Sequence, residues 1–91
     1  MAKSFMLEIV TPEKRFYSGE VEFVVVRTLS GEEGFLANHI WAVKLLGEGE
    51  LRLREPDSKE PRCADISGGF IDVHGDILIY TDSAEWKEET A

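Results

Sequence analysis

The segment LSGEEGFLANH, residues 29–39, carries two carboxylates and an imidazole among glycines. Glu32, Glu33 and His39 are of the residue types that act as general acids and bases or bind divalent metals. A metal site needs three or four converging ligands with supporting outer contacts, and this spacing matches no established ligand pattern. A small metal-dependent enzyme built on these three residues therefore stays open as an alternative, while solvated charges on a loop are the simpler interpretation.

Other reactive residue types lack a catalytic setting. His74 flanks a hairpin turn, which is typical of an exposed strand end, and Cys63 has only Arg62 beside it to lower its pKa. The pair Gly68 and Gly69 precedes a strand instead of a helix, so these glycines predict a bulge or corner and not a phosphate loop. We therefore predict a protein without catalytic residues, metal or cofactor.

The composition predicts one acidic domain. The chain has 91 residues and a net charge of -8, from 10 Lys and Arg against 18 Asp and Glu, which disfavours nucleic acid and anionic membrane surfaces as partners. Its single cysteine excludes an intrachain disulfide. No signal peptide or apolar run of about 18 residues is found, so we expect a soluble protein.

Short β-type runs separated by turn residues dominate the chain, which predicts an all-β sandwich or barrel. The run LRLRE alternates strictly, with Leu51 and Leu53 facing inward. We expect a turn at GEGE, residues 47–50, and a hairpin at Gly75-Asp76. From Ser83 the pattern predicts a short helical turn, and we divide the chain into a domain at 1–84 and an acidic stub at 85–91.

The segment at 29–39 is also interpreted as a shaped loop. Gly31 and Gly34 free the backbone, Phe35 and Leu36 anchor the loop to the core, and the glutamates point outward. A rigid acidic loop on a β-scaffold suits recognition of a basic or polar partner. Trp41 fits the core and an interface equally well.

Five motifs in order resemble a known family. They are LEIVTPEKRFYSGEVEFVVV, GEEGFLANH, GELRLR, SGGFIDV and ILIYTDSAE. Together they are similar to the N-terminal β-sandwich domain of the epsilon subunit of F-type ATP synthases, from about Phe5 to Trp86.

The resemblance implies a flattened sandwich of about ten short strands. It also implies a non-catalytic subunit of the rotor, or central stalk, that binds the gamma subunit and contacts the c ring. Such a subunit couples proton or sodium passage to ATP synthesis or hydrolysis. It would lie at the cytoplasmic face of the bacterial cell membrane, peripheral and not inserted, with no small-molecule ligand.

By position in the motifs, the resemblance implies roles for individual residues. The predicted c-ring contacts are Gly31, Glu32 and Glu33. The predicted gamma contacts are Thr11, His39, Trp41 and Lys44, with Trp41 included because tryptophan is enriched at interfaces. The predicted structural glycines are Gly49, Gly68 and Gly69.

The chain departs from the family pattern in three places. It reads HIWAV where the family commonly reads His-Ala-Pro, and Glu33 stands where a leucine is usual. The chain also stops where a two-helix C-terminal domain usually begins, so this polypeptide is expected to lack the inhibition and nucleotide binding of those helices. A free-standing β-sandwich interaction module, unrelated to the synthase, is the second alternative.

Overall fold

The computed structural model describes residues 3–87, and in this range the chain forms eight strands and no helix. The strands are β1 (Phe5–Val10), β2 (Arg15–Val21), β3 (Phe23–Thr28), β4 (Gly31–Leu36), β5 (Ala42–Arg54), β6 (Arg62–His74), β7 (Asp76–Tyr80) and β8 (Ala84–Trp86). The prediction of an all-β fold is therefore confirmed.

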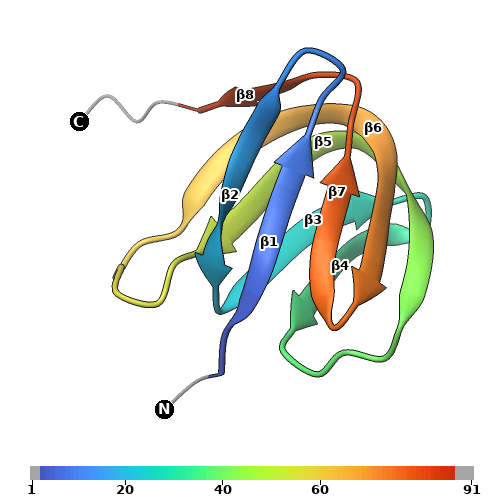
Figure 1. Cartoon of the computed structure of the whole chain (residues 1–91). Helices are drawn as coiled ribbons and strands as arrows, with labels where there is room; N and C mark the ends of the chain where they lie inside the picture. Colours follow the sequence, from blue (N-terminus) through green and yellow to red (C-terminus); the bar gives the residue numbers. More distant parts are fainter. Residues whose placement is uncertain (1–2, 88–91) are drawn as a thin grey trace.

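One hydrogen-bonded sheet folds over into two layers (Figure 1). Its strand order is β2-β1-β7-β6-β5-β3-β4, with β8 paired to β6, and only the β1–β7 pair is parallel. The two longest strands, β5 and β6, run through both layers. The first layer holds β2, β1, β7, the start of β5 and the end of β6; the second layer holds β3, β4, β8 and the other halves of β5 and β6.

Glycines allow the two long strands to bend between the layers. Gly68 and Gly69 in β6 have φ angles of 101° and 116°, which favour glycine. A side chain on Gly69 would also collide with the Tyr80 carbonyl and lie 2.8 Å from the Thr81 Cα atom. Both glycines thus have the backbone conformation that a bend in the strand needs.

The prediction of a turn at residues 47–50 is wrong, and the described residues form eight strands where about ten were expected. Glu48 and Glu50 pair with Ser67 and Asp65 of β6, so the chain stays in the ladder and only bends. The run LRLR thus belongs to one long strand, β5, which begins at Ala42. Gly49 leaves room for the Arg27 side chain, because a Cβ atom at this position would lie 2.9 Å from the Arg27 Nε atom.

Alternation along the strands builds the core between the layers. Leu51 and Leu53 are fully buried, as predicted, while Arg52 and Arg54 face outward. The other fully buried large apolar side chains of the described residues are Leu7, Ile9, Val21, Val24, Val26, Phe35, Ile71, Val73 and Ile79. A core shared by both layers holds the two sheet faces at a defined distance.

The hairpin prediction at the end of the chain is confirmed, and the helical turn after it is wrong. Gly75, with φ 84°, connects β6 to β7. Residues 84–86 form β8, which pairs with Ala64–Ile66 of β6, and the Trp86 ring stacks on Phe16 at 4.6 Å. This packing outweighs a weak local helix preference. The predicted boundary after residue 84 stays a prediction, and residues 88–91 of the stub lie outside the described residues.

Candidate functional site

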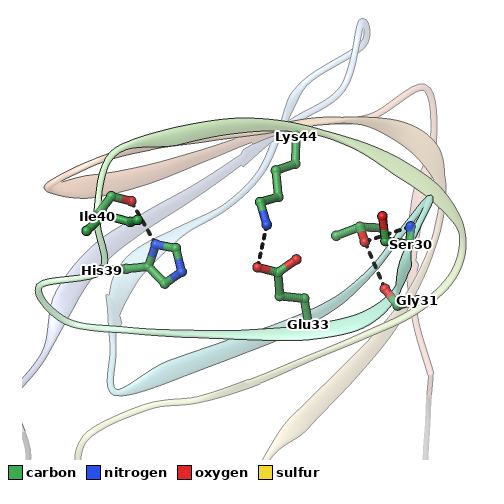
Figure 2. Close-up of polar contacts among 7 residues, drawn as sticks. Ser30, Gly31, Glu33, His39, Ile40 and Lys44 are labelled. Atoms are coloured by element: carbon green, nitrogen blue, oxygen red, sulfur yellow. Dashed lines mark hydrogen bonds and ion pairs between the residues drawn. The ribbon is translucent and has the colours of Figure 1, made fainter.

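The glycine-framed segment is a strand and not the predicted loop. Strand β4 pairs with β3 in antiparallel register, and a tight turn at Leu29–Ser30 connects them. The Thr28 hydroxyl donates to the Gly31 carbonyl at 2.9 Å and accepts from the Ser30 N–H at 3.1 Å (Figure 2). Phe35 anchors β4 in the core as expected, but Leu36 does not, because 64% of its surface is exposed.

Because β4 is a strand, its two glutamates point to opposite sides. Glu32 faces outward, with one carboxylate oxygen 3.7 Å from the Arg52 guanidinium. Glu33 faces the space between the layers, where it accepts a hydrogen bond from the Lys44 ammonium at 2.6 Å (Figure 2). Glu33 and Lys44 were predicted to meet different partners; the structure brings them together as a link between the two layers.

His39 lies in the connection between β4 and β5. Its backbone N–H donates to the Leu36 carbonyl at 3.3 Å, its Nδ1 atom lies 2.7 Å from the Ile40 carbonyl oxygen, and its ring packs against Phe35 (Figure 2). The three residues of the metal-enzyme alternative thus each have a different neighbour. In residues 3–87, no cluster of three His, Cys, Asp or Glu side chains is arranged to hold a metal ion.

Thr11 is part of a buried turn between β1 and β2. Its hydroxyl donates to the Lys14 carbonyl at 3.1 Å and accepts from the Lys14 N–H at 3.2 Å. The side chain is only 7% exposed. Its visible function is therefore to shape this turn.

A prominent surface feature is a set of exposed apolar side chains at the start of β5, which we call the apolar row: Val43 and Leu45 on the outer side of the strand, and Trp41 just before it. Their exposed fractions are 68%, 68% and 62%. The intervening Ala42 and Lys44 point toward the second layer, as strand alternation requires. Large exposed apolar side chains grouped on one strand are typical of an interaction surface.

Neighbouring strands extend and bound the apolar row. Phe70 lies opposite Leu45 and stacks on Tyr80 with ring centroids 5.7 Å apart. The His74 ring packs on Trp41 at 4.0 Å, and its Nδ1 atom lies 3.8 Å from an Asp72 carboxylate oxygen. The surface therefore combines an apolar strip with an adjacent polar and acidic side.

Sequence reasoning found Trp41 but missed Val43 and Leu45. Both follow Trp41 at intervals of two residues, which places all three on one side of a strand. The inward-facing Lys44 was the signal that its neighbours face the solvent.

The apolar row offers contact surface to a partner. A partner that covered the apolar row would remove three large side chains from water, and each such burial is worth about 1.5–3 kcal/mol before the costs of association. Among residues 3–87 there is no helix long and apolar enough to cross a membrane. The geometry thus defines a β-sandwich with an exposed apolar surface suited to contact with another protein.

Comparison with known proteins gives the same class. Residues 4–87 match the family model for the ATP synthase, Delta/Epsilon chain, beta-sandwich domain. The ATP synthase epsilon chain of Alkaliphilus metalliredigens (strain QYMF) is 48% identical over 90 residues, and that of Alkaliphilus oremlandii (strain OhILAs) is 42% identical. Each alignment covers 98% of this chain and 66% of the relative.

A solved structure agrees with the sequence comparisons. A chain in the cryo-EM structure of Euglena gracilis mitochondrial ATP synthase, which comprises OSCP, F1 and c-ring, superposes with a TM-score of 0.87 at 28% identity. The superposition covers 97% of this chain and 56% of that chain.

The chain belongs to the ATP synthase delta/epsilon chain family. The relatives named above are epsilon chains, and this chain spans just under two thirds of their length. Membership in this family overturns the alternative of an interaction module unrelated to the synthase.

Proposed function

We propose that the chain is a non-catalytic rotor subunit of a rotary ATP synthase, which binds the gamma subunit and contacts the c ring. The observation that carries this proposal is the exposed apolar row on β5, in a chain whose family match extends over residues 4–87. In this role the subunit couples ion passage to ATP synthesis or hydrolysis by fitting between two rotating parts. It would be held at the cytoplasmic face of the membrane by the complex.

The gamma contact is centred on the apolar row, with His39 at one end. Trp41 is the anchor, because a large aromatic side chain in a partner pocket contributes strongly to affinity. Lys44 contributes indirectly, since its ion pair with Glu33 holds β5 against β4 at 2.6 Å. The outward side chains of β5 are thereby presented in a fixed position.

The c-ring contact is at the beginning of β4. Gly31 follows the turn that connects β3 to β4, and Glu32 carries an exposed carboxylate on the outer side of the second layer. An exposed carboxylate suits the basic or polar groups of a partner loop. Glu33 supports this contact from the interior through Lys44.

A binding measurement with the cognate gamma subunit tests the proposal. We expect a stable one-to-one complex at micromolar concentrations, seen as co-elution in size-exclusion chromatography and as saturable binding in calorimetry. If no complex forms under conditions in which both proteins are folded, the proposal is wrong.

The c-ring contact has its own prediction. Glu32→Lys should weaken assembly of the gamma complex onto isolated c rings and leave the free energy of unfolding within about 1 kcal/mol, because an exposed ion pair contributes little to stability. Gamma binding serves as the control and should be unchanged. Normal c-ring assembly by this variant would remove Glu32 from the contact.

A further inference from the structure

Strand β5 has neighbours on both sides along only part of its length. It pairs with β6 from Ala42 to Leu53, whereas its pairing with β3 involves only Leu46 and Arg52–Arg54. In the described part of the chain, β6 is therefore the one strand that neighbours the first residues of β5. The Leu29 N–H reaches the Leu45 carbonyl at 3.4 Å, which marks where the pairing on the other side stops. We call residues 42–44 the open edge of β5.

An open edge exposes backbone N–H and C=O groups that can pair with another chain. Proteins usually block such edges with charges, proline, glycine bulges or short strands. The open edge of β5 contains no proline or glycine, and its outward side chains belong to the apolar row. Its one charged residue, Lys44, is directed away from the outer face and is paired with Glu33 (Figure 2).

The two terminal strands of the sheet, β2 and β4, differ from this edge. Strand β2 carries Arg15 and Glu20 together with Ser18 and Gly19. Strand β4 carries two glutamates and two glycines. Both compositions are poor for strand pairing, since glycine weakens strands and exposed charges repel an added chain. The open edge of β5 is therefore better suited to accept a strand than either of these two edges.

We propose that an extended segment of the gamma subunit adds to the open edge of β5 as a further strand of the first layer. This inference rests on the proposed function and specifies how that partner binds. Backbone hydrogen bonds to residues 42–44 would supply register, and alternate apolar side chains of the segment would cover the apolar row. The sheet would continue from β6 through β5 into the partner.

Charge indicates the remaining chemistry of the segment. Asp72 lies opposite Val43 on β6, and Asp76 lies opposite His74 on β7, so the surface beside the apolar row is acidic. A segment with Lys or Arg flanking its apolar residues complements that surface. A second copy of this chain does not, because each copy carries a net charge of -8.

Residue-resolved amide hydrogen exchange tests the added strand. In the free chain, amides of the open edge that point away from β6 should exchange quickly, and those bonded to β6 should exchange slowly. In the complex with the cognate gamma subunit, we expect the fast amides among residues 42–44 to slow at least about tenfold. The amides of β2 and β4 serve as internal controls and should not change.

Single proline substitutions at Ala42, Val43 and Lys44 give a second test. Proline removes the backbone N–H of the residue it replaces. Where that N–H bonds to β6, the substitution should destabilise the fold; where it points to the open edge, stability should not change. The proline variant with an unchanged melting temperature should bind gamma about fivefold to tenfold more weakly than the wild type. Alanine at Val43 or Lys44 is the matched control for loss of the side chain.

The outcomes separate the two proposals. A complex with slowed open-edge amides supports the added strand. A complex in which these amides exchange as in the free chain overturns the added strand and leaves gamma binding intact. Absence of any complex overturns the proposed function and this inference with it. If the chain alone self-associates and slows the same amides, the occupant is a second copy and the assignment to gamma is wrong.

Discussion

The two halves of β5 share one strand and one alternation of side chains, but they face different surroundings. In the C-terminal half, β3 and β6 flank the strand, Leu51 and Leu53 fill the core, and the outward positions are arginines. In the N-terminal half, β6 is the neighbour, and the outward positions are Val43 and Leu45. The inward position between these two is a lysine.

This difference distinguishes a surface suited to contact with water from a surface suited to contact with a partner. Outward arginines are held by acidic neighbours, as in the Arg54–Glu22 pair at 2.6 Å, and make a finished surface for water. An outward apolar row leaves a surface that is suited to burial against another protein. The exposed fractions in the single chain therefore do not show why Val43 and Leu45 are apolar; the proposed contact gives a reason.

The bend of β6 at Gly69, which pairs with Leu46 in the middle of β5, has the largest expected effect on stability. Gly69→Ala should destabilise the fold by about 3 kcal/mol or more, because the new side chain meets the backbone of Tyr80 and Thr81 at a positive φ angle. Urea unfolding measures the loss. The control is Gly34→Ala, whose nearest neighbour would be Val25 Cγ2 at 3.6 Å and which should cost less than about 1 kcal/mol. Equal effects would mean that Gly69 does not define the corner.

The next prediction compares two leucines on the same strand. Leu53→Ala should lower the free energy of unfolding by about 3 kcal/mol, because a fully buried side chain leaves a cavity. Leu45→Ala should change it by less than about 0.5 kcal/mol, since that side chain is already exposed to water. Chemical denaturation of both variants provides the comparison. A large loss for Leu45→Ala would show that the apolar row supports the fold of the isolated chain.

The smallest effect concerns the end of the C-terminal half. Burial, together with a 2.8 Å hydrogen bond to Glu55, raises the pKa of Tyr17 to about 12. The unfolded chain releases this proton near pH 10, so stability from this group is complete below about pH 10 and is lost as the pH rises toward 12.

Between about pH 9 and about pH 11.5, the free energy of unfolding should therefore fall by roughly 2 kcal/mol less in Tyr17→Phe than in the wild type. Urea unfolding of wild type and variant across this range gives the difference. Identical pH profiles would show that Tyr17 ionises normally in the folded chain.

Much of the fold could be predicted because local signals and tertiary contacts agree. The alternation of LRLR identified the inward leucines, and the glycine pair at 68–69 identified the corner. The hairpin at Gly75 follows from the same kind of turn chemistry. In these segments each local preference matches the packing that the whole sheet requires.

The parts that could not be predicted depend on pairing over long range. GEEGFL has a weak strand preference, yet β3 and the burial of Phe35 make it a strand. Its register then determines that Glu33 turns inward to Lys44, 11 residues away. No local pattern shows which of two neighbouring glutamates will face the solvent.

Gamma binding by two matched variants tests the central claim most directly. Leu45 and Leu36 are similarly exposed leucines, 62% and 64%, on the outer sides of different layers. Leu45→Lys should weaken binding to the cognate gamma subunit about a hundredfold, because it places a charge in a buried apolar contact. Leu36→Lys should bind as the wild type does. Equal affinities of the two variants, or a loss confined to Leu36→Lys, would contradict the assignment of the apolar row to the gamma contact.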